Sequence, residues 1–419
     1  MPRELALSIL REITENDAFS DLAVKNGLAA SKLPSRDKAL ATALVYGTIQ
    51  HLRFIDFQLE SVSARPLGTL TPDIRNILRL AVYQIRFMDR IPDRAAVDEA
   101  VKMAKRHAYS ASSFVNGVLR NLLRKGWSYP KKLRARLGVT YSFPDWLVKL
   151  WIEQFGAPEC EKLLEASNSV PPISVRVNPL KSSPEAVLAL CKGERAQTET
   201  GLYIEEPSNI AETPLFSDGW LTVQDEGAQM ASITLAPLPG DAVLDVCAAP
   251  GGKTTHMAEL MENEGSVTAW DIHPHRVELI RKNAERLGLQ NVKAEVHDAR
   301  ILDPDHMWKY DKVMVDVPCS GLGIIRKKPD IKWRRIPDDL ASLTVEQATI
   351  LETASYYVKR GGTLVYCTCT LNKQENEDIV DAFLRLHSEY EKAAEYRTLL
   401  PHVDKTDGFF IAKLRKRWN

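Results

Sequence analysis

The sequence is poor in cysteine and has no long uncharged apolar run. Its 419 residues include six cysteines, which are scattered between Cys160 and Cys369. So few and so widely spaced cysteines exclude a disulfide framework, and we expect a reducing, cytoplasmic environment. Nowhere do about 18 uncharged apolar residues follow one another, so no membrane span is expected. Charges interrupt the apolar positions of the first 17 residues, which argues against a secretory signal.

The chain also lacks a net charge, because 55 Lys and Arg balance 55 Asp and Glu. The balance is uneven along the chain: residues 1–135 contain 22 Lys and Arg against 13 Asp and Glu, which gives this part +9 and leaves −9 for the remainder. A basic module joined to an acidic one favours a nucleic acid as partner, although a solvated helical surface can be equally basic. The length and the average composition predict two or three globular domains.

Hydrophobic periodicity divides the first half of the chain into two regions. Residues 1–128 show helical spacing, as in Ile74, Ile77 and Leu78, with Pro- and Gly-containing breakers between the runs. This region predicts an all-α bundle. Residues 129–236 combine two helical stretches with an alternating strand pattern and predict a small α+β connector domain.

The third region, residues 237–419, alternates apolar strands with helices. Such a pattern predicts an α/β domain with a mostly parallel sheet that is covered on both faces. Ligands of such sheets bind outside the carboxyl ends of the strands, so the motifs at strand ends become the candidate site. No low-complexity linker or repeat separates the regions, and we expect packed domains.

The turn VCAAPGGKTT lacks the first glycine of a phosphate-binding P-loop. Gly252, Lys253 and Thr254 have the order that ends such a loop, but Cys247 occupies the position that must be glycine. The G-x-G-x-x-G spacing of dinucleotide-binding turns is missing too. A strand that ends near Asp245, small residues and a helix that opens near Thr254 instead predict a turn whose backbone approaches a ligand and whose free amides favour a carboxylate.

Carboxylates follow at successive strand ends. Asp271 ends the next strand, 20 residues after Gly251, where a carboxylate accepts hydrogen bonds from both ribose hydroxyls. Asp298 is predicted to end the third strand and to face an adenine edge. Each acid alone is equally well explained as a helix cap, but together they predict a nucleoside site. A nucleoside with a carboxylate and no phosphate describes S-adenosylmethionine, although other nucleosides fit a similar pocket.

Cys319 and Cys369 each follow a later apolar strand. A lone buried thiol is usually a small core residue, and the spacing of these cysteines is not that of a zinc site, so no metal is expected. Two thiols at the ligand-bearing edge favour nucleophilic catalysis: a thiolate that adds to carbon 6 of cytosine activates carbon 5 toward an electrophilic methyl group. A second group must then remove the carbon 5 proton. Asp316 is suited to hydrogen-bond the cytosine edge, and the residues alone leave open which thiol attacks.

Several segments resemble known families. The RNA cytosine-C5 methyltransferases, often called the NOL1/NOP2/Sun group, have signature segments similar to LDVCAAPGGKTTHMAELM, DVPCSGLG, KKPDIKWRR and YCTCTLNKQENEDIV. DKALATALVYGTIQH and SSFVNGVLRNLLRK resemble the NusB-type RNA-binding helical domain. The combination is similar to bacterial enzymes that methylate small-subunit ribosomal RNA. It implies a NusB-like N-terminal domain, the connector and a Rossmann-like class I methyltransferase domain.

The resemblance also implies roles for the motif residues. Cys369, in the TC motif, corresponds to the nucleophile, and Cys319, in the PC motif, to the residue linked to product release; DNA cytosine methyltransferases instead use the PC cysteine as nucleophile. The residues implied to bind S-adenosylmethionine are Cys247, Ala248, Ala249, Pro250, Gly251, Gly252, Lys253, Asp271, Asp298 and Asp316. The implied partner is ribosomal RNA, with a monomer as the default. A DNA or tRNA cytosine-C5 methyltransferase and a non-catalytic RNA-binding assembly factor remain as alternatives.

Two positions depart from the family pattern. The family usually has Ser where this chain has Cys367, and Ala where it has Val317. Cys367 is predicted to be a packing residue on the opposite side of its strand from Cys369. Residues 333–335, Trp-Arg-Arg, either contact RNA or anchor this segment to the protein surface.

Overall fold

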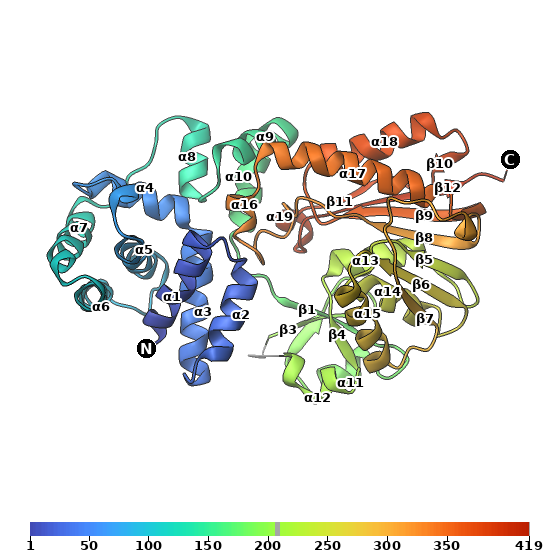
Figure 1. The fold of residues 1–419 in the computed structure, drawn as a ribbon, viewed down its shortest axis with the longest axis horizontal. Coiled ribbons are helices and arrows are strands. Elements are labelled where there is room, and N and C mark those ends of the chain that lie inside the picture. Colours follow the sequence, from blue (N-terminus) through green and yellow to red (C-terminus); the bar gives the residue numbers. More distant parts are fainter. Residues whose placement is uncertain (206–209, 419) are drawn as a thin grey trace. The chain divides into compact units, whose positions relative to one another are not determined.

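The protein forms two compact units in a computed structural model that describes residues 1–205 and 210–418 (Figure 1). Residues 1–169 and 325–334 make up the helical unit. The α/β unit comprises the described parts of 170–324 and 335–419. The boundaries of the three domains expected from the sequence stay a prediction. In the structure, the helices of residues 133–166 belong to the same compact unit as the N-terminal helices.

The helical unit confirms the all-α prediction for the N-terminal region. Its main helices are α1 (Pro2–Glu15), α2 (Ser20–Ala30), α3 (Ser35–Gln50), α4 (Leu52–Val62), α5 (Pro72–Phe87), α6 (Asp93–His107), α7 (Ser112–Lys125), α8 (Leu133–Thr140), α9 (Asp145–Phe155) and α10 (Ala157–Ala166). A short helix, α16 (Ile331–Arg334), joins them from a distant part of the chain.

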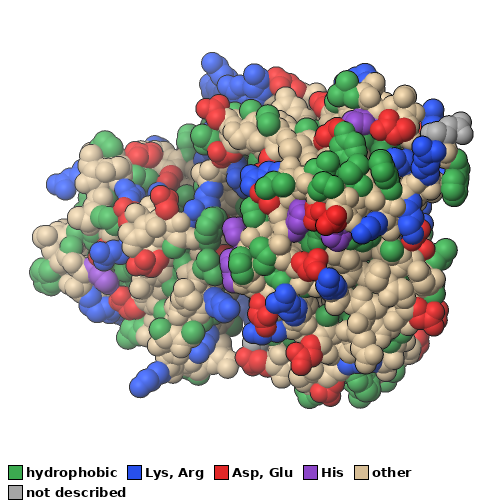
Figure 2. All heavy atoms as spheres, turned by 45° about the vertical axis from the view of Figure 1, so that its right-hand side comes forward, with side chains coloured by type: hydrophobic (Ala, Val, Ile, Leu, Met, Phe, Trp, Pro, Cys, Tyr) green, Lys and Arg blue, Asp and Glu red, His purple; other side chains and the backbone are tan. Residues whose placement is uncertain are grey.

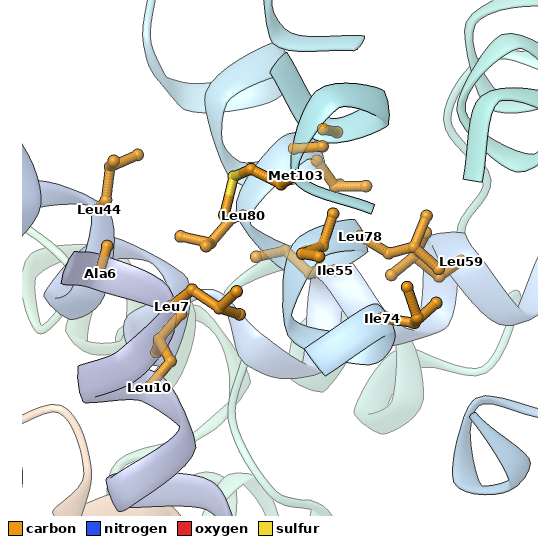
Figure 3. Close-up of a cluster of buried hydrophobic side chains, with 14 of the residues drawn as sticks. Ala6, Leu7, Leu10, Leu44, Ile55, Leu59, Ile74, Leu78, Leu80 and Met103 are labelled. Atoms are coloured by element: carbon orange, nitrogen blue, oxygen red, sulfur yellow. The ribbon is translucent and has the colours of Figure 1, made fainter. Parts of the chain in front are cut away.

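The core of this unit is an apolar cluster between α1, α3, α4, α5 and α6 (Figure 3). Leu7 of α1 points toward Ile55 of α4 in this view. Leu7, Ile55, Leu10 of α1 and Leu78 of α5 belong to the same cluster, and all four are at most 2% exposed. The predicted stripe of α5 is buried here because its apolar residues recur every three to four positions. Each such side chain contributes about 1.5–3 kcal/mol of transfer free energy.

The α/β unit begins with a small antiparallel sheet of order β2-β3-β1-β4. Its strands are β1 (Ile173–Val177), β2 (Gly193–Arg195), β3 (Gly201–Ile204) and β4 (Leu221–Val223), accompanied by the short helices α11 (Pro184–Leu188) and α12 (Pro214–Ser217). Val175 and Val177 are fully buried. The alternating pattern that predicted β1 marks these two valines correctly. It does not show that Ser174 and Arg176 on the other face are buried too, so the strand is buried on both faces rather than on one.

The second sheet has the order β10-β12-β9-β8-β5-β6-β7, with β11 beside β12. Strands β7, β6, β5, β8 and β9 are parallel to their neighbours, whereas β12 pairs antiparallel with β9. The strands are β5 (Ala242–Asp245), β6 (Ser266–Asp271), β7 (Val292–Val296), β8 (Tyr310–Asp316), β9 (Val358–Thr368), β10 (Tyr390–Lys392), β11 (Arg397–Leu399) and β12 (Phe409–Lys416). The mostly parallel Rossmann-like sheet is thus confirmed.

Helices lie along this sheet in Figure 1, with α17 and α18 near β9 and β12 and with α14 and α15 near β6 and β7. Their bounds are α13 (Glu226–Leu235), α14 (Gly252–Leu260), α15 (Pro274–Leu287), α17 (Pro337–Ser355), α18 (Glu377–Leu386) and α19 (Pro401–Asp404). The chain runs outward through β6 and β7 on one side of β5 and through β8 and β9 on the other. The topological switch point therefore lies between β5 and β8, and Asp245 and Asp316 end these two strands.

The surface carries charges of both signs. On the face of the α/β unit drawn in Figure 2, Lys and Arg side chains are interspersed with Asp and Glu. In the part of the chain that the structure describes, no helix combines the length and the apolar character needed to span a bilayer.

Candidate active site

The turn after β5 is compact and depends on a glycine. Gly251 has φ +102° and precedes α14, and a Cβ atom there would lie 3.2 Å from Cα of Ile280. Its N–H donates to the carbonyl of Ala248 at 2.7 Å. The helix begins at Gly252, so the start predicted near Thr254 was two residues late. Small residues in this turn leave the backbone accessible to a ligand.

The two carboxylates expected after β6 and β7 differ in their surroundings. Asp271 is the last residue of β6, as predicted, and its Oδ1 accepts from the N–H of His273 at 3.0 Å. Asp298 lies two residues beyond the end of β7 at Val296, so the prediction that it ends the strand was wrong. Arg300 donates to both of its oxygens, at 2.9 and 2.7 Å, and this hydrogen bonding lowers the pKa of Asp298.

A third carboxylate, Asp245, was not singled out from the sequence. It ends β5, is 1% exposed, and its Oδ2 accepts from Oγ1 of Thr254 at 2.7 Å. Burial raises the pKa of Asp245 to about 7, and the nearby charge of Asp316 adds to this effect. The signal that sequence reasoning missed is an acid that closes an apolar strand at the switch point.

An ion pair joins the turn after β5 to the end of β8. Nζ of Lys253 lies 2.7 Å from Oδ2 of Asp316 and 5.2 Å from the ring centroid of Phe409. Burial by itself would lower the pKa of Lys253, but the charge and hydrogen bond of Asp316, together with Cys367 and Asp245, outweigh burial and raise that pKa. Two of the predicted site residues are thereby brought into direct contact.

The two cysteines singled out from the sequence meet at the same edge of the sheet. Strands β8 and β9 are parallel neighbours, and Cys319 and Cys369 follow their ends with their sulfur atoms 3.3 Å apart. Both residues are partly exposed. The contact with Cys369, and then burial, raise the pKa of Cys319 well above that of an ordinary thiol. Within the described residues, no group of three His, Cys, Asp or Glu is arranged to hold a metal ion.

Cys367 does not lie on the face predicted for it. Its sulfur is 3.5 Å from Oδ1 of Asp316 and 3.8 Å from Sδ of Met314, in the apolar cluster against which Cys369 also packs. Because both cysteines pack against this one cluster, the predicted opposite orientation was wrong. The predicted packing role of Cys367 is supported because its side chain is fully buried. Burial, together with the charge of Asp316, raises the pKa of Cys367, so this thiol keeps its proton.

The first two residues of the Trp-Arg-Arg segment are anchors within the helical unit. Nε1 of Trp333 donates to the carbonyl of Ile49 at 2.8 Å. Nη2 of Arg334 donates to the carbonyl of Ala18 at 2.6 Å. Of the two interpretations left open by the sequence, anchoring is the one that these contacts support.

Next to them, Lys332 is a buried residue that sequence reasoning overlooked. Its Nζ donates to the carbonyl of Gln50 at 2.7 Å and to Oδ1 of Asn168 at 3.1 Å, and it lies 4.1 Å from the ring centroid of Phe143. Burial lowers the pKa of Lys332 well below its ordinary value. In the sequence it is one of several basic residues in KKPDIKWRR and is not distinguished from solvated ones.

Arg176 of β1 is a second buried cation that the sequence did not reveal. It forms two hydrogen bonds with Glu259, at 2.7 and 2.8 Å, and both side chains are fully buried. The same guanidinium donates to the carbonyl of Gly252 at 2.9 Å and to Oγ1 of Thr255 at 3.1 Å. The small sheet therefore supports the first turn of α14, next to the candidate ligand turn.

Comparison with known protein families covers most of the chain. Residues 232–415 match the family described as 16S rRNA methyltransferase RsmB/F, and residues 1–124 match the NusB family. Residues 143–211 match the ferredoxin-like domain of RsmF/B-like methyltransferases.

Individual relatives extend over the full length. The chain is 38% identical to the probable ribosomal RNA small subunit methyltransferase B of Bacillus subtilis, over 99% of this chain and 98% of that protein. The crystal structure of PH0851 is similar with a TM-score of 0.83 at 29% identity, covering 99% of both chains. The structure of NSun6 from Pyrococcus horikoshii with SFG has a TM-score of 0.59 at 25% identity and covers 69% of this chain and 98% of its own.

Proposed function

Because this chain belongs to the RsmB/F family of 16S rRNA methyltransferases, we propose that it methylates carbon 5 of a cytosine in small-subunit ribosomal RNA. The proposed methyl donor is S-adenosylmethionine. The proposed route is a covalent adduct between Cys369 and carbon 6 of the base.

The observation that carries this proposal is the pair of sulfur atoms 3.3 Å apart at the carboxyl edge of the sheet. One thiol can attack a base only from one side, and the adduct then needs a second group close to carbon 5. Cys319 lies within reach of any base bonded to Cys369. The raised pKa of Cys319 supports its assignment as the thiol that keeps its proton while Cys369 attacks.

The chemistry assigns a separate task to each cysteine. The Cys369 thiolate forms a bond to carbon 6, and the electron pair of the carbon 5–carbon 6 double bond attacks the methyl group. S-adenosylmethionine would supply that methyl as an electrophile on sulfonium sulfur, and cleavage of the methyl–sulfur bond would leave S-adenosylhomocysteine. The adduct removes the Cys369 contact that contributes most to raising the pKa of Cys319, so Cys319 then loses its own proton to solvent more readily and becomes available as a base. It then takes the carbon 5 proton, the double bond re-forms, and the bond to Cys369 breaks.

Asp316 is proposed to hold the cytosine during attack. Its Oδ2 faces Lys253 and its Oδ1 lies near Cys367, so the carboxylate is fixed between the ligand turn and β9. A carboxylate in this position accepts a hydrogen bond from the amino edge of the base or from its protonated ring nitrogen. Lys253 offsets the charge of Asp316 and keeps it in place.

The proposed donor site is formed by residues 247–253 and Asp271. The glycine at position 251 and the small side chains beside it allow a close approach to the backbone. Asp271 is at a strand end where a carboxylate binds ribose hydroxyls. Asp298 is the weaker member, because both of its oxygens already accept from Arg300. These features fit a nucleoside with a carboxylate.

The helical unit is proposed to hold RNA through phosphate contacts, which position a substrate without reading its sequence. Its match to the NusB family and its net positive charge support this role. The target cytosine must leave its stack before Cys369 reaches carbon 6.

The covalent step is tested by replacing each cysteine. We expect Cys369→Ala to abolish the covalent enzyme–RNA complex and methyl transfer. Cys319→Ala is expected to form the adduct but release it slowly, so RNA stays bound through denaturing electrophoresis. A trapped complex in Cys369→Ala and none in Cys319→Ala would reverse the assignment of the two thiols.

The substrate is tested by bisulfite sequencing of ribosomal RNA from cells with and without the gene. Loss of one modified cytosine from 16S RNA is the expected result. Labelled methyl transfer to purified RNA, tRNA and duplex DNA separates the alternatives: label in tRNA or DNA alone would contradict the ribosomal substrate. An RNA-binding assembly factor would transfer no label to any of them.

A further inference from the structure

The loops that carry the two cysteines are joined by more than their sulfur atoms. Oγ of Ser320 lies 2.6 Å from Oγ1 of Thr370, so the residues that follow the cysteines also form a pair. The N–H of Gly323 donates to the carbonyl of Cys369 at 3.0 Å. A Cβ atom at Gly323 would lie 2.8 Å from that carbonyl oxygen, so the two backbones approach as closely as a glycine allows.

Behind this pair of loops lies a buried carboxylate, Glu375. Its Oε1 accepts from Oγ of Ser320 at 2.5 Å and from Nδ2 of Asn372 at 3.0 Å. Its Oε2 accepts from the N–H of Ser320 at 2.8 Å and from Nε2 of Gln347 at 2.9 Å. The side chain is fully buried, and all four groups that contact it are donors. A side chain that accepts hydrogen bonds through both of its terminal oxygens, as an ionised carboxylate does, is needed to pair with all four donors.

These donors come from both cysteine loops. Ser320 follows Cys319 directly, and Asn372 is three residues beyond Cys369. Gln347, from α17, also donates to the carbonyl of Pro318 at 2.9 Å and so fixes the other side of Cys319. The carboxylate thus connects the two loops at a point where neither belongs to a strand or a helix.

Three further hydrogen bonds hold the loops around this carboxylate. Nε of Arg335 donates to the carbonyl of Ser320 at 3.1 Å. Asn376, the neighbour of Glu375, accepts from Oγ1 of Thr368 at 2.6 Å and donates to the carbonyl of Thr370 at 3.0 Å. Cys369 is therefore held on both sides by Asn376 and by the end of β9, whereas Cys319 depends on the contacts of its loop.

We infer that Glu375 is a positioning residue that holds the Cys319 loop against the Cys369 loop, so that Cys319 reaches carbon 5 of the base bonded to Cys369. The inference rests on the proposed function and extends it to a residue that contacts neither ligand. It separates the two chemical steps: attack by Cys369 depends on β9 and Asn376, whereas proton removal by Cys319 depends on Glu375.

The direct test is Glu375→Gln, which keeps the shape but puts an amide NH₂ where two donors already point. Multiple-turnover methylation is expected to fall about 10–100-fold, as for a reacting group displaced by about 1 Å. The covalent complex with ordinary RNA accumulates, as in Cys319→Ala. Adduct formation on RNA with 5-fluorocytosine, which needs no proton removal, is expected to stay within about threefold of the wild-type rate, because the hydrogen bonds of Asn376 on both sides of Cys369 are kept.

Asp378→Asn is the matched control. Asp378 is an exposed carboxylate of the same segment that pairs with Lys373 at 3.2 Å, so its neutralisation makes the same chemical change outside the cluster. We expect wild-type turnover and release. Ser320→Ala, which removes one of the four donors and keeps the carboxylate, is the milder second variant and is expected to slow release in the same direction by less.

A pH profile distinguishes positioning from general loosening of the fold. The charge of Glu375 adds to the Cys369 contact and burial in raising the pKa of Cys319. Removing that charge lowers this pKa, so the rise of the release rate with pH is expected to move to lower pH in Glu375→Gln. An unchanged profile, normal release, or equal losses of adduct formation and release would overturn the inference. Absence of any adduct in the wild-type protein and in Cys319→Ala would instead refute the proposed function.

Discussion

Each unit withdraws a lysine largely from solvent, with Lys332 fully buried and the side chain of Lys253 12% exposed, and the two lysines differ in their partners. Lys332 of the helical unit donates to two uncharged oxygens, and burial lowers its pKa well below the ordinary value. Lys253 of the α/β unit contacts the carboxylate of Asp316, which raises its pKa despite burial. The same side chain thus responds in opposite directions because only one of the two has a counter-charge.

The different partners of the two lysines reflect a difference in the interiors of the two units. The helical unit is built around an apolar cluster (Figure 3). Lys332 there ties the short helix α16 to the carbonyl of Gln50 and to Asn168. The α/β unit places charged side chains in its interior beside the ligand turn, where they are held by specific partners. A charge pair is costly to bury and is retained where position and charge matter more than stability.

The largest expected effect comes from breaking the buried pair in the α/β unit. Arg176→Met leaves the carboxylate of Glu259 buried without its cation and is expected to lower the free energy of unfolding by about 3–5 kcal/mol. Chemical denaturation followed by circular dichroism measures it. Arg195→Met is the matched control, because Arg195 pairs with Glu185 at 3.3 Å on the surface of the same small sheet, and its loss should cost less than about 1 kcal/mol. Equal effects would remove the distinction between buried and exposed pairs.

A smaller effect, on catalysis, is expected from Lys253→Met. The change leaves Asp316 without its counter-charge and frees the carboxylate to turn away from the base. We expect kcat/KM for methyl transfer to fall about 100-fold, within the range for truncating one partner of a buried charge pair. Lys359→Met is the control, because Lys359 of β9 pairs at 2.8 Å with Asp311 of β8, the strand that also carries Asp316, away from its carboxyl end. A similar fall in both variants would show that Lys253 is not specific to the site.

The smallest effect is a change in how stability depends on pH. The folded-state pKa of Asp245 is raised from 3.8 to about 7, so the unfolded chain loses this proton first and stability falls as pH rises through that window. Asp245→Asn is expected to gain a few degrees in melting temperature over wild type at pH 8 but not at pH 4, since about 1 kcal/mol corresponds to 2–4 °C for a domain of this size.

Lys332 is expected to change the pH dependence of stability in the opposite direction to Asp245. Its folded-state pKa is lowered, so the unfolded chain binds the proton more strongly, and stability rises with pH until the ordinary lysine value of 10.5 is reached. Lys332→Met is expected to lose this rise. Thermal melts of wild type and both variants between pH 4 and pH 9 measure the two slopes, and parallel curves for all three would contradict both assignments.

Much of the fold could be predicted because it depends on local patterns. The helical spacing of Ile74, Ile77 and Leu78 reports which face α5 buries, and the buried residues agree with it. The alternation in β1 predicted the strand, but it did not show that Ser174 and Arg176 on the other face are buried as well. Some of the predicted ends of strands were wrong by one or two residues, as for β7, which ends two residues before Asp298. The face of Cys367 was misjudged although the two-residue period of a strand determines it.

The sequence by itself determined the order of helices and strands, the turn with Gly251, and the fact that Cys319 and Cys369 would reach one edge, since parallel strands end together. Only the tertiary structure decided the 3.3 Å between their sulfur atoms, the four donors around Glu375, and the partners of Lys253 and Lys332. Periodicity describes one segment at a time, whereas these contacts join residues tens to hundreds of positions apart. Their charges and hydrogen bonds acquire a meaning only when packing excludes water from them.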